Sequence, residues 1–98
     1  MNEKNYVIVR ADQAGVFFGD LVKKEGSEVT LNECRKIHYW DGASAIEQLA
    51  LDGVLEETKN DCKFTVTVNN STINNYIQII ECSEKAIKSI KSVKEWKK

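Results

Sequence analysis

Two arginines, Arg10 and Arg35, are the side chains of this 98-residue chain best suited to binding an anion. The chain contains twelve lysines and only these two arginines, so we expect each arginine to do something that lysine cannot. A guanidinium group can donate two parallel hydrogen bonds to a phosphate or a carboxylate. We therefore take Arg10 and Arg35 as candidate phosphate-binding residues.

Aromatic side chains accompany the arginines. Tyr39 and Trp40 close the predicted strand that contains Arg35, and Phe17 belongs to the neighbouring predicted strand. An aromatic face can stack on a nucleobase, a contact worth about 1–3 kcal/mol per base. With Asn74, whose amide could read a base edge, these residues make up the predicted ligand-binding site.

The same residues also have a purely structural interpretation. Arg10 and Arg35 could form ion pairs with Asp12 or Glu33, while the aromatic side chains fill a core or a subunit interface. Residue chemistry alone leaves both interpretations open.

The residue pattern does not predict a catalytic site. His38 lies in a predicted strand without an adjacent nucleophile, and the carboxylates of Asp12, Asp20 and Asp41 lack the spacing of a metal loop or an acid–base pair. Glycine-rich phosphate-binding loops and the nucleophile elbow are also missing from the sequence. We expect a binding protein that is not an enzyme, with no cofactor and no metal.

The cysteines indicate the compartment. Cys34, Cys62 and Cys82 are odd in number and widely spaced, which fits neither a closed disulfide framework nor a paired-cysteine zinc site. Buried, reduced thiols are typical of a cytoplasmic protein. There is no hydrophobic run of signal-peptide length, and no apolar stretch approaches the roughly 20 residues that span a bilayer.

Charge is distributed unevenly along the chain. Residues 83–98 hold six lysines and two glutamates, a net charge of +4, which leaves −5 on residues 1–82 out of a total of −1. The helical lysines recur every three residues and so wrap around the helix, which weakens the case for a phosphate-binding stripe. The overall balance makes nucleic-acid binding an unfavoured interpretation.

Hydrophobic periodicity predicts strands first and helices later. We expect strands over 6–10, 16–24 and 28–39, the last with a β-bulge near Asn32 or Glu33. Ser44 and Glu47 fit a capping box that opens a helix running to about residue 51.

The second half of the chain repeats this order. Strict alternation over 62–68 predicts a half-buried strand, 69–72 a polar turn and 76–81 a further strand. Ser83 is expected to cap a final helix whose apolar face ends at Val93. The sequence predicts one compact α+β domain over 1–98, an antiparallel sheet of about five strands with two short helices, and a flexible basic tail over 93–98.

A resemblance to a known family extends this interpretation. The runs 6–22 (Tyr-Val-Ile-Val-Arg-Ala-Asp-Gln-Ala-Gly-Val-Phe-Phe-Gly-Asp-Leu-Val) and 28–40 (Glu-Val-Thr-Leu-Asn-Glu-Cys-Arg-Lys-Ile-His-Tyr-Trp) are similar to a family of small tailed-bacteriophage proteins. Gly42-Ala43, Gln48-Leu49-Ala50, Gly53-Val54, Cys82-Ser83-Glu84-Lys85-Ala86 and Lys88-Ser89-Ile90 fit the same family. Arg10, Arg35, Tyr39 and Trp40 lie within the matching segments.

By analogy, the resemblance implies a role in taking over a host cell. Small phage proteins include sponges that sequester the nucleotide signals of bacterial immunity, as anti-CBASS and anti-Thoeris proteins do. The leading hypothesis is therefore a cytoplasmic homo-oligomer that binds a small cyclic or phosphate-bearing nucleotide without chemistry. One alternative is a module that inhibits a host protein through an aromatic anchor such as Trp40 or Trp96. A single-stranded nucleic-acid binder ranks lower.

Overall fold

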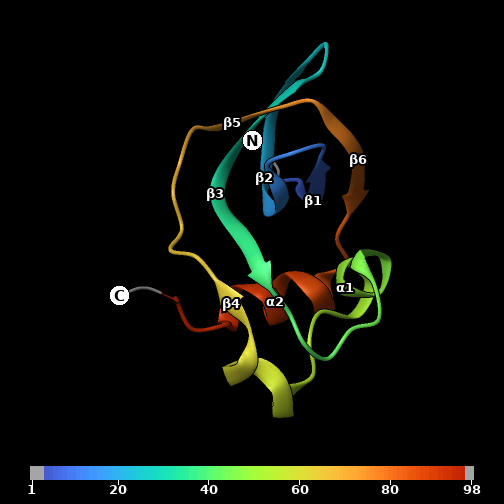
Figure 1. Ribbon diagram of the computed structural model, residues 1–98, viewed down its shortest axis with the longest axis vertical. Helices are drawn as coiled ribbons and strands as arrows, with labels where there is room; N and C mark the ends of the chain where they lie inside the picture. Colours follow the sequence, from blue (N-terminus) through green and yellow to red (C-terminus); the bar gives the residue numbers. More distant parts are fainter. Residues whose placement is uncertain (1–3, 97–98) are drawn as a thin grey trace.

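The computed structural model describes residues 4–96, which form an antiparallel sheet packed against two α-helices (Figure 1). The elements are, in order, β1 (Tyr6–Ala11), β2 (Gly15–Glu25), β3 (Glu28–Tyr39), α1 (Ile46–Asp52), the 3-10 helix η1 (Glu56–Asp61), β4 (Lys63–Phe64), β5 (Ser71–Asn74), β6 (Tyr76–Glu81) and α2 (Glu84–Ser92). The predicted α+β class is confirmed.

The sheet curves so that the consecutive strands β5 and β6 lie along its two outer sides. β2 lies between β1 and β3, β6 pairs with β1, and both β4 and β5 pair with β3. Asn75, with φ of 61°, joins β5 to β6. Its N–H donates to the carbonyl of Ser27 (2.8 Å) and its carbonyl accepts from the N–H of Asp12 (3.0 Å). This corner therefore ties together the two turns of the β1–β2–β3 meander.

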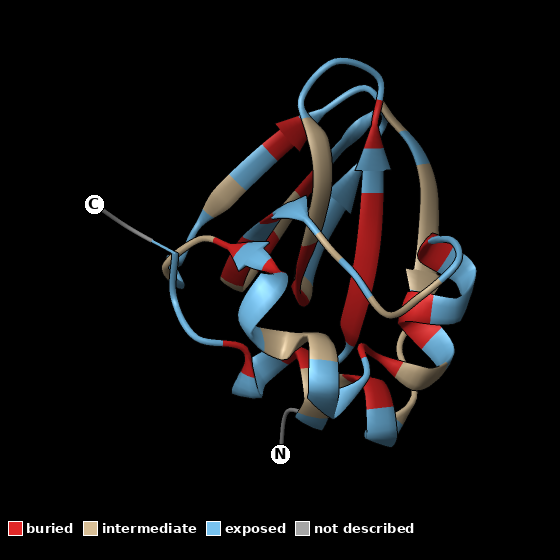
Figure 2. Cartoon of the chain, turned by 60° about the horizontal axis from the view of Figure 1, so that its bottom comes forward, coloured by how far each residue is buried: buried red, intermediate tan, exposed pale blue. Residues whose placement is uncertain are grey.

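Buried side chains form two clusters, one on each face of the sheet. Figure 2 shows where the buried positions fall along the strands and helices. On the face that carries the helices, which we call the helix face, Phe18 packs with Leu49 of α1 and Ile90 of α2. On the opposite, concave face, Val9 packs with Leu31. Successive side chains of a strand alternate between faces, so each strand of the meander supplies both clusters.

The β-bulge predicted near Asn32 and Glu33 is confirmed. Glu33 has φ of 50°, and β3 holds one residue more than β2 between two successive pairs of the ladder. The extra residue turns Cys34 to the concave face, where it packs in the same cluster as Leu31. The strand then continues with the alternation shifted by one residue.

The helix ends agree only in part with those predicted from the sequence. Ser83 caps α2 as predicted, because its Oγ accepts the N–H of Ala86 (3.0 Å), and Gly53 ends α1 with φ of 74°. The prediction that Ser44 caps α1 is wrong: the helix begins at Ile46, and no side chain caps it. The N–H of Ser44 instead donates to Oε1 of Gln48 (2.7 Å), which holds the preceding loop against the first turn.

The segment 62–74 departs most from the prediction. Only Lys63–Phe64 is regular strand within 62–68, and the chain forms strand again from Ser71, inside the predicted turn. The side chain of Thr65 explains the irregularity, since its Oγ1 accepts the N–H of Lys36 (2.8 Å) where a backbone carbonyl would continue the ladder. Strict alternation over 62–68 would place Val68 on the same inward face as Phe64, but Val68 is 48% exposed whereas Phe64 is fully buried.

The C-terminal segment lies against β4. Val93 is buried, and the N–H of Trp96 donates to the carbonyl of Phe64 (2.8 Å). The tail predicted over 93–98 is thus in contact with the fold at 93–96, and residues 97–98 lie outside the described part. Within 4–96, no helix has both the length and the apolar character needed to cross a membrane.

Glu33 provides a pH-dependent contribution to stability. Lys4 donates a hydrogen bond to its carboxylate, Tyr6 donates another (3.0 Å), and Lys91 lies 3.5 Å away. These contacts, the Lys4 bond first, hold the pKa of Glu33 below its ordinary value of 4.5. The stabilisation is therefore present above that pH and is lost as the pH falls through the lower folded value.

We expect Glu33→Gln to flatten the acid limb of the stability curve. Urea denaturation at a series of pH values from neutral downward should show the wild type losing more stability than the variant as Glu33 becomes protonated. Parallel losses in both proteins would show that Glu33 makes no such contribution.

Gly53 and Gly26 offer a matched pair for testing the contact between α1 and α2. Both have positive φ, but a Cβ at Gly53 would lie 2.3 Å from Cβ of Ser89, whereas nothing lies within 4 Å of a Cβ at Gly26. Gly26→Ala should cost about 1–2 kcal/mol for the backbone alone. Gly53→Ala should cost about 1–3 kcal/mol more, because α2 must shift and because the Gly53 backbone, with ψ of −153°, lies in a region that essentially only glycine adopts. Equal losses in denaturant titrations would contradict the close approach.

Candidate functional site

Arg10 and Trp40 line one pocket at the edge of the helix face, although 30 positions separate them in the chain. The pocket has a volume of about 290 Å³. It is lined by Arg10, Val16, Trp40, Ala45, Ile46 and Glu47. Two of the six residues predicted to bind a ligand are thus brought together.

Arg10 is positioned by the central strands. It pairs with Val16 of β2 on one side and with Gln78 of β6 on the other. Tyr6 and Ile8 occupy every second position of β1 and are buried on the helix face. Arg10 is the next residue of β1 on that face, at the point where the face becomes exposed to solvent. The strand ladder therefore fixes its backbone while the guanidinium remains accessible to solvent.

Trp40 is positioned by the loop that follows β3. Its indole N–H donates to the carbonyl of Ala43 (3.3 Å), and its ring packs against the helix-face cluster. The side chain is partly buried, so one part of the indole is fixed and another faces the pocket. This arrangement suits a stacking surface because its orientation is set before a ligand arrives.

Glu47 places a negative charge in the same pocket. Nε2 of Gln78 donates to its carboxylate (3.1 Å). This bond, with a smaller contribution from the charge of Arg10, lowers the pKa of Glu47. The pocket therefore combines a cation, a carboxylate held in its ionised form and an aromatic ring. Such a set can bind a ligand that carries an anion, an N–H donor and a planar group.

Arg35 lies elsewhere, inside the helix-face core. It is 3% exposed and donates to the carbonyls of Thr65 (2.9 Å), Ile90 (2.8 Å) and Phe64 (3.3 Å). Burial lowers the pKa of the guanidinium, and the charge of Glu95 opposes that shift. The hydrogen bonds are directed at backbone carbonyls, so Arg35 joins segments of this chain.

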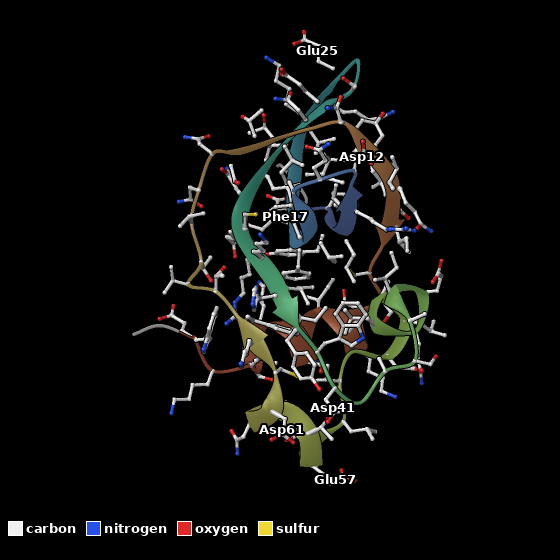
Figure 3. The ribbon with its side chains drawn as sticks, viewed as in Figure 1. Asp12, Phe17, Glu25, Asp41, Glu57 and Asp61 are labelled. Carbon is white, nitrogen blue, oxygen red and sulfur yellow. The ribbon has the colours of Figure 1, made fainter. Side chains whose placement is uncertain are left out.

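The other predicted residues lie outside the pocket. Phe17 is on the concave face, with Nζ of Lys36 6.0 Å from its ring centre; Figure 3 places it near the middle of the sheet. Tyr39 is 49% exposed at the end of β3, and Asn74 lies opposite Glu28 at the end of β5.

Two features of the surface were missed by sequence reasoning. Glu47 was considered only as part of a helix cap, yet it contributes the carboxylate of the pocket. His38 stacks on Trp96, with ring centres 4.9 Å apart and planes 13° apart, and Nζ of Lys63 lies 5.5 Å from the Trp96 ring. Trp96 remains 43% exposed. A contact between positions so far apart has no local sequence signal.

A larger cavity, of about 620 Å³, lies between the end of α1, η1 and α2. Its charged lining is mixed, with lysines such as Lys85 and Lys88 beside acidic residues such as Asp52 and Glu56. The cavity lacks both an arginine and an aromatic ring among its lining residues. We therefore place the candidate nucleotide site at the smaller Arg10–Trp40 pocket.

Metal and thiol chemistry are not apparent in the part of the chain that the structure describes. No group of three or more histidine, cysteine or acidic side chains in residues 4–96 is arranged to hold a metal ion. The three cysteines are free thiols. Burial raises the pKa of each, that of Cys82 to about 12, so thiolate is scarce at neutral pH.

Comparison with known proteins finds one family. The model of the family described as Domain of unknown function (DUF6948) matches residues 4–90. No curated protein and no solved structure matches the chain.

The two arginines should respond differently to the same substitution. Arg35→Lys removes donors from buried carbonyls and should lower the free energy of unfolding by about 2–4 kcal/mol. Arg10→Lys, at an exposed position, should stay within about 0.5 kcal/mol of the wild type. Chemical denaturation of both variants measures this, and a stable Arg35→Lys protein would contradict the structural role of Arg35.

Proposed function

Since the chain belongs to the DUF6948 family, we propose its function from its own geometry: non-enzymatic binding of a small phosphate-bearing nucleotide in the Arg10–Trp40 pocket. The observation that carries this proposal is that an exposed arginine and a partly fixed indole line one pocket. Arginine suits a phosphate and the indole face suits a base.

The carboxylate of Glu47 narrows the choice of ligand. Arg10 and Glu47 share the pocket, so a simple anion would be attracted by the charge of the arginine and repelled by the charge of the carboxylate. A nucleotide whose base carries an exocyclic amino group can satisfy both, with phosphate at Arg10 and N–H donors at Glu47. The proposed ligand is therefore an amino-bearing nucleotide, such as one of adenine, guanine or cytosine.

The size of the pocket sets the scale of the ligand. Its volume of about 290 Å³ is just below the range of about 300–1,000 Å³ that is typical of small-molecule sites. One base with its sugar and phosphate fits that scale, whereas a cyclic dinucleotide would extend beyond a single pocket.

The biological role that we propose is sequestration of a nucleotide signal of host immunity in the host cytoplasm by a phage-type protein. The similarity of residues 6–22 and 28–40 to small tailed-phage proteins supports this role. A sponge needs a pre-organised pocket and no reaction, and a Trp40 ring held by Ala43 is consistent with that requirement.

A second candidate function is binding to a host protein. Trp96 favours it, because the ring is 43% exposed while His38 and Lys63 hold its orientation. Exposed, pre-oriented tryptophans are typical anchors of protein interfaces. This function would leave the Arg10–Trp40 pocket unused.

A thermal-shift screen against mononucleotides and cyclic di- and trinucleotides at physiological salt tests the proposal. A ligand at a hundredfold its Kd should add about 2.7 kcal/mol of apparent stability. Arg10→Gln should weaken binding by about tenfold or more, since a charge-assisted hydrogen bond contributes about 1.5–3 kcal/mol. The ligand recovered after incubation should be chemically unchanged.

Matched variants separate the two candidate functions. Trp40→Leu should abolish the nucleotide shift and Trp96→Leu should leave it intact, whereas capture of a host protein should show the reverse. Glu47→Gln should reduce the preference for amino-bearing bases while retaining phosphate binding. No shift with any nucleotide would overturn the proposed function.

A further inference from the structure

A further cavity, of about 230 Å³, opens beside Arg35; we call it the Arg35–Lys91 cavity. It is lined by Phe18, Glu33, Arg35, Thr67 and Lys91. Arg35 and Phe18 are partners across the β2–β3 ladder, and both are almost fully buried, at 3% and 1% exposed. Thr67 lies at an exposed position of the segment that follows β4. The cavity therefore leads from solvent to a buried guanidinium.

The guanidinium of Arg35 retains donors for a ligand. Three of its five N–H groups donate to the carbonyls of Phe64, Thr65 and Ile90 in the described part of the chain, 4–96, which leaves two. These acceptors are uncharged, and Glu95, whose charge acts on Arg35, lines a different cavity. Burying a cation is costly unless opposite charge and further hydrogen bonds replace its hydration. An anion in the Arg35–Lys91 cavity would supply both.

The charged lining of the Arg35–Lys91 cavity is positive overall. Two cations, Arg35 and Lys91, stand against the carboxylate of Glu33, which gives a net charge of +1. Lys4 and Tyr6 also donate hydrogen bonds to that carboxylate, so part of its charge is compensated by residues outside the lining. Nζ of Lys91 donates to Oη of Tyr6 (2.7 Å) and lies 4.2 Å from the centre of its ring. An oriented ammonium thus accompanies the buried guanidinium.

We propose that the Arg35–Lys91 cavity binds a free tetrahedral oxyanion of the size of inorganic phosphate. The two remaining guanidinium donors suit a pair of its oxygens, Lys91 adds a second cation, and the hydroxyl of Thr67 can donate to a further oxygen. A water molecule takes about 30 Å³ in the liquid, so 230 Å³ accommodates such an anion with several waters.

The proposed anion would join three parts of the fold. Arg35 belongs to β3, Lys91 to α2 and Thr67 to the irregular segment between β4 and β5. Stability should therefore rise with the concentration of the anion, because the folded state alone brings these groups together. The lining residues differ from those of the Arg10–Trp40 pocket, so this inference does not rest on the proposed nucleotide function.

Thermal unfolding of the full chain with added inorganic phosphate, at an ionic strength held constant with sodium chloride, tests the site. The wild type should show a saturable rise in Tm. Lys91→Gln should weaken phosphate binding by about tenfold or more, because a charge-assisted contact is lost, and Thr67→Val should weaken it less. Lys88→Gln is the matched control: it makes the same charge change on α2, but Lys88 lines the larger cavity and its loss should leave phosphate binding intact.

Two carboxylate variants show which cavity the phosphate occupies. Glu33→Gln removes the negative charge from the Arg35–Lys91 cavity and should tighten phosphate binding several-fold, whereas Glu47→Gln, in the Arg10–Trp40 pocket, should leave it unchanged. The site would be overturned by the lack of a saturable shift, by equal weakening in Lys91→Gln and Lys88→Gln, or by tightening in Glu47→Gln alone. Each of these readouts is obtained without a nucleotide, so failure here and failure of the proposed function are separate results.

Discussion

The hydrogen bonds from Arg35 hold the C-terminal half of the chain against the sheet. One guanidinium on β3 binds carbonyls of the segment around β4 and of the last turn of α2. The carbonyls at a helix C-terminus carry partial negative charge, so Ile90 provides an electrostatic partner as well as an acceptor. Arg35 also lies over the ring of Phe64, 5.4 Å from its centre. A buried charge thus replaces the regular strand pairing that the 62–68 segment lacks.

That arrangement shows where sequence reasoning succeeds and where it does not. The rarity of arginine draws attention to Arg35 as a candidate phosphate-binding residue, but its hydrogen-bond partners are the carbonyls of residues 64, 65 and 90. Nothing local to β3 predicts them. Local chemistry does specify the strand 76–81, the Ser83 cap and the Gly53 helix end, because each depends on residues within one turn or strand. The bulge at Glu33 is also predictable, since it restores an alternation that the sequence visibly breaks.

The Arg10–Trp40 pocket could be predicted from the sequence only in part. Arg10 and Trp40 were selected for their chemistry, and their meeting depends on α1 packing beside β1 and β6. The contribution of Glu47 depends further on Gln78, which comes from a strand 31 residues later. Phe17 and Phe18 show the same limit: adjacent rings in the sequence belong to opposite faces, and which one is buried with the helices follows from the strand register.

The corner at Asn75 brings together strands that lie far apart along the chain. The β1–β2–β3 meander needs only contacts between neighbouring segments, so its loops close at little entropic cost. Pairing of β1 with β6 joins Val7 to Glu81, a separation of 74 residues, and non-local pairing of this kind slows folding. During synthesis the meander emerges with both of its sides uncovered, and it stays so until residues 71–81, which form β5 and β6, have left the ribosome. The final strand therefore acts as the closing step of folding, and the half-made sheet is the species most exposed to association with other chains.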